Sequence, residues 1–499
     1  SNYRQKFLDL PGCVLILVGI PTMIPTSTRW YHHSPLAVQL ACSPPARASP
    51  LNGFNLKLER RRRPAGAETI AMERLVRTAR HLIAPSPAAG DSDNEVATTE
   101  EVGTAWREHL PGLIPPARAD ADWVERVAAL HELVPMAKSK LLKQDWEFMR
   151  GGSDAEASVR RNRLELDSLA LRPSMLEDVS SIDLSTELFG AKLSFPIITA
   201  PMGGMLRWDS QGACACARAA SKSGVMSCLS SLADGLQPAP TSSLEGTAAS
   251  CAGPKIFQLY VRGDDDFVDD HARRAIAAGY TAFAITVDVQ LVSRREGMIT
   301  SRYQKAAGSA SGGAGGLDHQ SRFSWANLAR FKSRWPGIPL LIKGIMTGAD
   351  AARCVEMGCE GVWVSNHGGR QLDQAQGTIA VLPEIVKAVG GRAKIVIDGG
   401  FLRGTDIVKA IALGADAVAL GRLTAVALSA GGEQGLVRAL DLLLEETHTV
   451  MGLMSKRNWA ELHPEDVVAA PYAAAGPPDL FSGFPYLQSM DGNFGQMRW

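Results

Sequence analysis

The feature that most limits how this chain can fold is a repeat that begins at Phe195, in which short apolar runs alternate with alanine-rich amphipathic stretches. Such alternation predicts a parallel sheet with right-handed helical crossovers. Eight units of this kind predict an α/β fold, the (β/α)8 TIM barrel, and a doubly wound sheet is the alternative. The predicted strands are Ile197–Ala200, Val225–Leu229, Ile256–Val261, Ala282–Val287, Leu340–Lys343, Gly361–Val364, Lys394–Ile397 and Ala417–Leu420.

Helical patterns fill most of the connections between these strands. One connection, from Asp288 to Pro339, is unusually long and contains the glycine-rich run Gly308–Gly316. A loop of this length and composition is typical of a mobile lid over a barrel mouth. The predicted helices of the barrel are Gly212–Ser223, Phe267–Ala278, Gly348–Met357, Ile379–Val389 and Gly404–Leu413.

We divide the chain into an N-terminal extension over residues 1–120, a barrel domain over residues 121–460 and a C-terminal tail over residues 461–499. The extension contains proline-rich runs and the basic run Arg60–Arg63, so we expect it to be largely disordered, with the basic run a solvated charge cluster. Residues 121–150 show helical patterns that lead into Gly151 and Gly152.

Charge is balanced over the 499 residues, with 52 basic and 52 acidic side chains. No net field therefore draws the protein to nucleic acid or to an anionic membrane surface. The apolar run Cys13–Ile20 is too short to span a bilayer. We expect no nucleic-acid partner and no membrane span, and we assign no metal site.

The first 63 residues contain only two acidic side chains, Asp9 and Glu59, which is compatible with an organelle-targeting leader. A second interpretation is a signal-peptide core at Cys13–Ile20. The third, which we favour, is a disordered or wrongly assigned leader, with Met72 as the true start. Most of the eight cysteines lie in apolar or small-residue runs, which indicates buried, reduced thiols. We therefore expect a cytoplasmic protein.

The run Ser365–Asp373 follows the apolar strand Gly361–Val364 and carries the clearest chemistry. Strand ends that open into polar, glycine-rich loops are where α/β barrels keep their active sites. His367 supplies a base, and Arg370 supplies a fixed cation that can hold a carboxylate. This pair suits proton abstraction next to a carboxylate, whereas His367 taken alone could simply cap a loop.

Two later strand ends predict a phosphate site. The run Asp398–Gly400 precedes a predicted helix, and Gly421 with Arg422 ends the next strand. Glycine loops after the seventh and eighth strands of a barrel, with a helix N-terminus nearby, form its usual phosphate site. Lys343 ends another buried strand, where it forms a structural ion pair or stabilises negative charge on a cofactor ring.

Together these residues resemble the family of FMN-dependent α-hydroxy-acid oxidases and dehydrogenases, which includes glycolate oxidase, lactate oxidases and mandelate dehydrogenases. The similarity covers roughly Trp123 to Asn458, and Ser365–Asp373 resembles the active-site motif of that family. Asp398–Gly421 resembles its phosphate-binding segment, and Gly151–Ser158 is most similar to the hydroxymandelate-oxidase-like branch. The resemblance implies an FMN cofactor and a homo-oligomer, because family members are commonly tetramers.

The resemblance also implies a role for each matching residue. By this similarity, His367 takes the substrate proton and Asp288 stabilises the resulting imidazolium. Arg370 and Arg295 hold the substrate carboxylate, and Tyr260 hydrogen-bonds the substrate hydroxyl or the developing oxyanion. The residues implied to bind FMN are Pro201, Met202, Gly203, Ser230, Gln258, Thr286, Lys343, Ser365, Asp398, Gly399, Gly400, Arg403, Gly421 and Arg422.

Four positions depart from the family pattern, and one of them is Gly203, which stands where an alanine is common. Phe148 stands where many members have a tyrosine that contacts the substrate carboxylate, and Leu232 stands where small-substrate oxidases carry a tryptophan. We assign both to the substrate pocket and expect a larger or aromatic substrate. Leu402 stands where the family has a phosphate-binding arginine, and we expect the adjacent Arg403 to compensate. Trp208 is expected to be a packing residue.

The predicted function is FMN-dependent oxidation of a 2-hydroxy acid to a 2-oxo acid, with a hydride or an electron pair passing to the flavin. The sequence leaves oxygen, a quinone or another protein open as the electron acceptor. Two alternatives remain. One is an FMN barrel oxidase that acts on an amino-acid or peptide-derived group in a biosynthetic pathway, and the other is a non-catalytic barrel scaffold.

Overall fold

The computed structural model describes residues 9–10, 13–15, 40–42, 126–233, 243–300, 316–470, 480, 481, 483, 484 and 487. The chain separates into two units, residues 1–96 and 97–499, which we describe individually. In the first unit, three short strands pair as an antiparallel sheet: β1 (Asp9–Leu10), β2 (Cys13–Leu15) and β3 (Leu40–Cys42). The predicted disorder of the remaining extension and the predicted lid at residues 308–315 lie outside the described residues.

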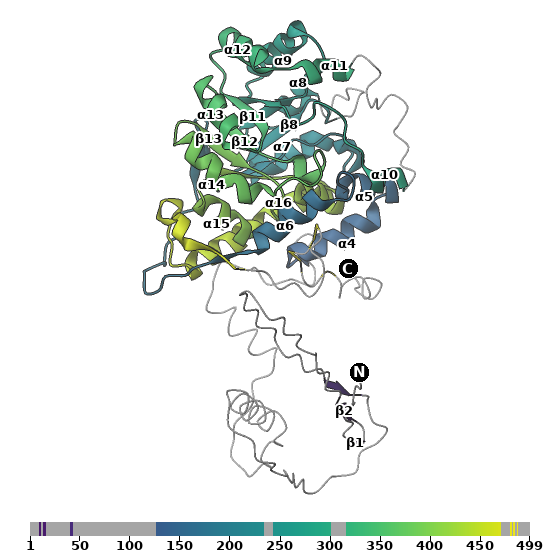
Figure 1. The fold of residues 1–499 in the computed structure, drawn as a ribbon, viewed down its shortest axis with the longest axis vertical. Helices are drawn as coiled ribbons and strands as arrows, with labels where there is room; N and C mark the ends of the chain where they lie inside the picture. The colour runs from purple at the N-terminus through teal and green to yellow at the C-terminus, as the bar shows by residue number, and fades with distance from the viewer. Residues whose placement is uncertain are drawn as a thin grey trace, which may run out of the picture. The chain divides into compact units, whose positions relative to one another are not determined.

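Eight parallel strands close into a barrel in the second unit, which confirms the predicted fold and excludes a doubly wound sheet (Figure 1). The strands follow one another around the barrel in chain order, and the last pairs with the first. They are almost entirely buried, because one face fills the barrel and the other meets the helices. They are β7 (Ile197–Thr199), β8 (Met226–Ser230), β9 (Lys255–Leu259), β10 (Ala282–Thr286), β11 (Leu340–Ile345), β12 (Gly361–Val364), β13 (Lys394–Ile397) and β14 (Ala417–Leu420).

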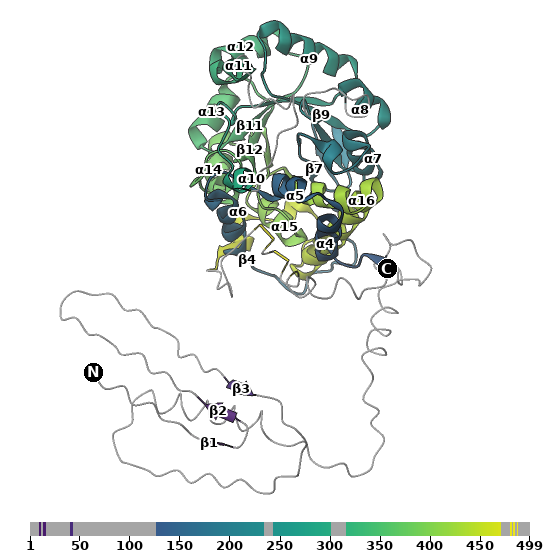
Figure 2. The same ribbon diagram turned by 90° about the vertical axis from the view of Figure 1, so that its right-hand side faces the viewer.

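The five predicted barrel helices are present, and they lie around the outside of the strands (Figure 2). Side-chain caps fix where several begin: the Asp264 carboxylate accepts a hydrogen bond from the N–H of Phe267, and the Thr347 hydroxyl accepts one from the N–H of Asp350. The barrel helices are α7 (Gly212–Lys222), α8 (Leu244–Ser250), α9 (Asp265–Ala277), α10 (Glu296–Thr300), α11 (Gly316–Arg322), α12 (Trp325–Arg334), α13 (Gly348–Glu356), α14 (Thr378–Val389), α15 (Gly404–Ala412) and α16 (Arg422–Leu453).

Segments from both flanks complete the barrel unit. The predicted helical stretch before Gly151 forms α4 (Leu130–Lys140) and α5 (Lys143–Arg150), and α4 packs along α16. Next comes α6 (Ala157–Asp167), and then β4 (Leu169–Leu171) pairs antiparallel with β15 (Val467–Ala469). The pairing joins a segment that precedes the barrel in the sequence to one that follows it. Ordered structure therefore continues past residue 460, into the predicted C-terminal tail.

A short hairpin closes the N-terminal end of the barrel. Its strands are β5 (Thr186–Leu188) and β6 (Ala191–Leu193), and the side chains at their ends pack with Trp363 inside the barrel. The ring of Phe189, at the turn, lies 3.1 Å from where a Cβ of Gly361 would stand, and Gly361 is the first residue of β12. The functional end is therefore the opposite one, where the strands finish.

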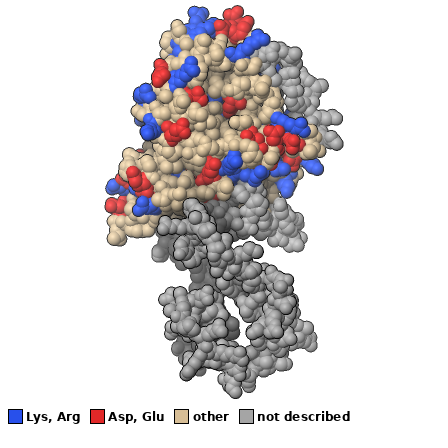
Figure 3. Space-filling model, viewed as in Figure 1, with Lys and Arg blue, Asp and Glu red and all other residues tan. Residues whose placement is uncertain are grey.

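Charged side chains and free cysteines are distributed over this unit as follows. On the face shown in Figure 3, basic and acidic side chains are interspersed rather than gathered by sign. Six described cysteines are free, and all but Cys251 are buried, as expected from their apolar surroundings. Within the described residues, no helix combines the length and apolarity needed to cross a membrane.

Candidate active site

A cavity of about 330 Å³ lies at the C-terminal ends of the barrel strands, where the sequence placed the site. Side chains and loops from all eight strand ends and from α5 line it. This arrangement brings together residues that are far apart along the chain, from Phe148 to Leu480. The predicted residues that line the cavity are Phe148, Pro201, Met202, Gly203, Leu232, Tyr260, Arg295, Lys343, His367, Arg370, Asp398, Gly399, Gly400, Gly421 and Arg422.

A histidine and its carboxylate partner stand at the centre of the site. Nδ1 of His367 lies 2.9 Å from Oδ1 of Asp288, which follows β10, and Nε2 lies 3.3 Å from the hydroxyl of Tyr260, which follows β9. The backbone of His367 is left-handed, with φ +58°, and Gly368 and Gly369 continue that conformation. The strained turn points the ring back over the barrel mouth instead of along the strand.

The electrostatics keep this histidine neutral. Burial lowers the pKa of His367, although the Asp288 carboxylate works against that shift. Burial also disfavours charge on Asp288, but the contacts with His367 and then Lys343 hold the pKa of Asp288 below its usual value. Nδ1–H can therefore donate to an ionised Asp288, which leaves Nε2 as an acceptor beside the Tyr260 hydroxyl. Burial raises the pKa of Tyr260, so its phenol stays a neutral donor.

Two arginines border the same end of the cavity. Nη1 of Arg370 donates to the carbonyls of Phe148 and Gly151, both at 2.7 Å. Nε of Arg295 lies 3.4 Å from the hydroxyl of Ser293, which also hydrogen-bonds the carbonyl of Arg370. Ser293 thus links the two arginines, and both guanidinium groups can face one carboxylate in the cavity.

Phe148 lies between two guanidinium groups. The Arg370 guanidinium carbon is 5.1 Å from the ring centroid, and that of Arg207 is 5.3 Å away. Arg207 is itself held by Asp145, 2.8 Å away in α5. Cations at these distances are attracted to the ring face, so Phe148 is fixed in place without a hydroxyl.

A buried ion pair connects three neighbouring strands below the cavity. Nζ of Lys343 lies 3.1 Å from Oδ2 of Asp398 and donates to the hydroxyl of Ser365 at 2.6 Å. Ser365 and the indole of Trp363 both donate to Asp398, at 2.8 and 3.0 Å. Burial disfavours the charge on Lys343, but Asp398 and then Asp288 raise its pKa above the usual value. A permanent cation therefore lies at the cavity wall.

Several groups fit a flavin. Gln258 and Thr286 are fully buried on adjacent strands, and among the described residues no partner reaches the Gln258 amide atoms or the Thr286 hydroxyl. Unpaired buried polar atoms are costly, so these call for the polar edge of a ligand. Gly421 lines the cavity, and a Cβ there would meet nothing within 4 Å, which keeps that space open. With Lys343, these residues would hold a flavin ring and its side arm.

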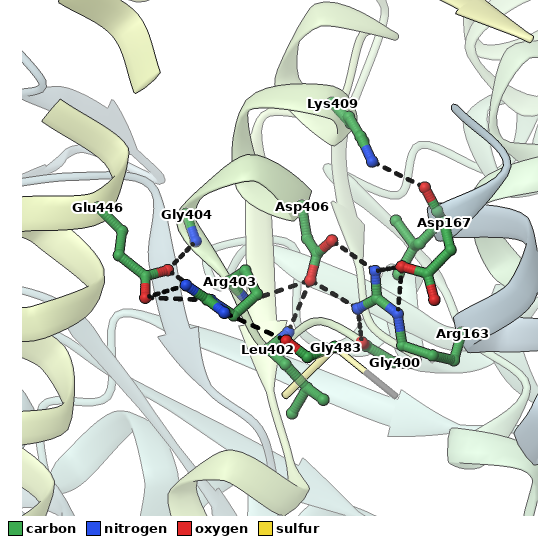
Figure 4. Close-up of polar contacts among 11 residues, drawn as sticks. Arg163, Asp167, Gly400, Leu402, Arg403, Gly404, Asp406, Lys409, Glu446 and Gly483 are labelled. Carbon is green, nitrogen blue, oxygen red and sulfur yellow. Dashed lines mark hydrogen bonds and ion pairs between the residues drawn. The ribbon is translucent and has the colours of Figure 1, made fainter. Parts of the chain in front are cut away.

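Arg403 differs from its predicted position. It does not line the cavity, because its guanidinium turns toward α16 and binds Glu446 at 2.9 Å and the carbonyl of Gly483 at 3.2 Å (Figure 4). Leu402 lines the cavity instead. The expected compensation for the missing arginine is therefore not seen. Three other predicted residues, Ser230, Gln258 and Thr286, lie on barrel strands, and Ser365 directly follows β12. Asp288 pairs with His367.

The sequence missed several residues that line the cavity, including the following four. Trp208, expected only to pack, lines the cavity and tilts against Phe148 with centroids 6.4 Å apart. Arg262 also lines it, and its position two residues after Tyr260 places it on the same side of an extended segment, which was a usable signal. Phe401 and Leu480 complete the wall. Leu480 comes from the tail, where no pattern pointed to the site.

The geometry defines a barrel whose cavity fits a flavin and contains a buried histidine–aspartate pair, and comparisons with known proteins support a flavin-dependent class. The model for "FMN-dependent dehydrogenase" matches residues 137–469. Glycolate oxidase of Spinacia oleracea is 36% identical over 364 residues, which is 69% of this chain and 96% of that protein. A peroxisomal (S)-2-hydroxy-acid oxidase of Oryza sativa subsp. japonica is 37% identical over 353 residues, covering 67% and 93%.

Solved structures lead to the same conclusion. Mandelate oxidase in complex with (S)-4-hydroxymandelic acid has a TM-score of 0.64 and 33% identity, and the match covers 69% of this chain and 99% of that one. Another mandelate oxidase structure has a TM-score of 0.62 and 35% identity, covering 67% and 97%. The chain belongs to the FMN-dependent dehydrogenase family. It is an FMN-dependent enzyme that oxidises 2-hydroxy acids.

Proposed function

We propose that the substrate is a 2-hydroxy acid with an aromatic or similarly bulky side chain. The observation that carries this proposal is the apolar wall around the catalytic end of the cavity. A substrate side chain that leaves water for such a wall gains about 25 cal/mol for each Å² of apolar surface that is buried. The wall consists of Phe148, Met202, Trp208, Leu232, Val289 and Val292.

We propose that His367 is the base. FMN, when bound, supplies the acceptor for the two electrons that leave the substrate. Nε2 of His367 takes the substrate proton, because Nδ1 is engaged by Asp288 at 2.9 Å and the ring is neutral before reaction. Asp288 then stabilises the imidazolium and keeps the ring oriented. Tyr260, within 3.3 Å of Nε2, hydrogen-bonds the oxygen that loses the proton.

We propose that Arg370 and Arg295 fix the substrate carboxylate. Carboxylate recognition by arginine is bidentate and directional, so it aims the Cα–H and the hydroxyl at the reacting groups. The flavin would lie against Pro201–Gly203, with Gln258, Thr286, Ser365 and Lys343 near its polar edge. Asp398–Gly400, Gly421 and Arg422 would surround its ribityl phosphate arm.

Oxygen is the proposed electron acceptor, because the named relatives are oxidases. We also propose a homotetramer and a cytoplasmic location. An organelle is the alternative, since a relative from Oryza sativa subsp. japonica is named as peroxisomal. Size-exclusion chromatography with light scattering tests the oligomeric state, and cell fractionation tests the location.

The test of the substrate is a panel of 2-hydroxy acids from glycolate to mandelates. Each is mixed with the flavin-loaded enzyme without oxygen, and the bleaching of the flavin absorbance is followed. We expect mandelates to reduce the flavin faster than glycolate or lactate. Faster reduction by glycolate would refute the proposed substrate class. Admission of air then tests the acceptor, because rapid return of the absorbance requires reaction with oxygen.

Arg262 supports a second candidate within the same reaction class, a 2-hydroxy acid that carries another acidic group. Arg262 lines the cavity, and its guanidinium has no hydrogen bond or ion pair among the described residues. An unpaired guanidinium beside a substrate side chain would bind a carboxylate or phenolate. Adding 2-hydroxy dicarboxylates to the panel, with Arg262→Gln as the control, separates the two candidates.

A further inference from the structure

The end of the cavity that faces the glycine loops after β13 and β14 is poor in positive charge. We call it the phosphate end, and it comprises Gly399–Leu402, Gly421, Arg422 and Leu480. Arg422 is the one charged side chain in this set. A phosphate monoester carries a charge of about −1.5 to −2 at pH 7, which one guanidinium does not balance.

Arg403 is close in sequence, but the protein holds it elsewhere. Its Nε lies 3.0 Å from each carboxylate oxygen of Glu446, and Nη2 lies 2.9 Å from the same group. The guanidinium carbon also faces the ring of Phe484 at 5.9 Å. Figure 4 shows this side chain pointing toward Glu446 and Gly483. A bidentate pair of this kind removes Arg403 from contact with a ligand in the cavity.

Arg163, the next nearest guanidinium, is also occupied. Its donors reach Asp406 at 2.7 and 2.8 Å, Asp167 at 2.6 and 3.0 Å, and the carbonyl of Gly400 at 2.8 Å (Figure 4). These contacts use all five N–H donors that an arginine has. The Arg163 side chain is 3% exposed, and the paired carboxylates raise its pKa against the effect of burial. It serves the fold below the glycine loop and offers no donor to the cavity.

The backbone N–H groups at the start of α15 are also taken up by carboxylates of the protein. The N–H groups of Leu402 and Arg403 both donate to Oδ2 of Asp406 at 3.0 Å, and the N–H of Gly404 donates to Glu446 at 2.8 Å. Free N–H groups at a helix N-terminus are what bind a phosphate. Here two carboxylates of the protein already occupy them.

Among the described residues that line this end, Arg422 is therefore the remaining cation. Its three nitrogens donate to the carbonyls of Met149, Gly368 and Gly151, at 3.2, 2.7 and 3.0 Å, which leaves two N–H groups for a ligand. Burial lowers the pKa of Arg422 to about 10, so it remains cationic at neutral pH. The positive end of the long helix α16, which starts at this residue, adds a partial charge.

We propose that the phosphate contributes little to flavin binding in this protein, so that riboflavin binds almost as tightly as FMN. Affinity then comes mainly from the ring, through Lys343 and the buried polar groups of Gln258 and Thr286, and from the ribityl chain. The inference rests on the proposed placement of the phosphate at the glycine loops after β13 and β14.

The test measures dissociation constants of FMN and of riboflavin for the flavin-free full chain, by quenching of flavin fluorescence. We expect a preference for FMN of less than about tenfold in the natural protein. In Leu402→Arg, a new charge-assisted contact is expected to tighten FMN binding by about tenfold or more and to leave riboflavin unchanged. The matched control, Leu402→Met, is expected to change neither. A preference above tenfold in the natural protein would overturn the proposal.

Two further variants locate the phosphate. The double variant Arg403→Gln/Glu446→Gln removes both charges of that pair, and we expect FMN affinity to stay within about twofold. A tenfold loss of FMN affinity in it would show that Arg403 binds the phosphate and refute the inference. Arg422→Gln is expected to make FMN and riboflavin equal. If it changes neither, the phosphate lies elsewhere and the inference fails, whereas failure of the hydroxy-acid panel would leave these ratios intact.

Discussion

The two ends of the cavity both contain arginines and carboxylates, but the carboxylates bind different partners at the two ends. At the catalytic end, formed by Tyr260, Asp288, His367 and Arg370, the carboxylate lies behind the histidine, so that reactive nitrogen faces the cavity. At the phosphate end, Asp406 and Glu446 bind the nearby arginines directly and draw them away from it. An arginine near a ligand site therefore indicates ligand binding only when carboxylates of the protein do not already take up its N–H donors.

The largest expected effect comes from removing the proposed base at the catalytic end. We expect His367→Ala to retain bound flavin but to slow substrate-driven flavin reduction by about 10³- to 10⁴-fold, because no other group can take the proton. Stopped-flow absorbance under anaerobic conditions measures the reduction, and the protein-bound flavin spectrum serves as the control for folding. Near-normal reduction by this variant would remove His367 from the role of base.

The next effect concerns the phosphate end, where the charges serve the fold. Asp406→Asn leaves the buried Arg163 with one carboxylate fewer, and we expect it to destabilise the protein by about 3 kcal/mol. Denaturant unfolding of the flavin-free chain measures this loss. The control is Glu461→Gln, which removes an exposed ion pair with Arg457 and is expected to cause no measurable change. Equal effects of the two variants would contradict the structural role of Asp406.

A smaller effect tests the catalytic end through the pH dependence of the flavin reduction rate. The base works as a neutral imidazole, so the reduction rate is low below the pKa of His367, rises through it and is level above it. Asp288 raises that pKa against burial, so Asp288→Asn is expected to move the acid limb to lower pH and to slow the plateau by about 100-fold. Reduction rates measured between acid and neutral pH test both expectations. An acid limb that moves to higher pH would contradict the pairing.

The smallest effect concerns the wall of the substrate pocket. Leu232→Trp adds bulk to the cavity, and we expect kcat/KM for mandelates to fall by about tenfold, with glycolate changed by less than about threefold. Steady-state assays with the two substrates measure the ratio. Equal losses for both would mean that Leu232 does not border the substrate side chain.

Most of the fold and the catalytic end could be predicted from the sequence because their signals are local. Eight short apolar runs give the barrel, and the run around His367 and Arg370 gives two side chains that line the cavity. The direction of Arg403 could not be read from its neighbours, because it depends on Glu446, 43 positions later on α16. Leu480 reaches the cavity from a tail without periodicity, and Trp208 looks in the sequence like any packing tryptophan.

The β5–β6 hairpin has a consequence for the order of events in turnover. Because it stops the barrel at one end, hydroxy acid, oxo acid and electron acceptor all share the entrance at the carboxyl ends of the strands. A molecule held by the arginines occupies that entrance while it is bound. We therefore expect oxidant and product to use this entrance in turn.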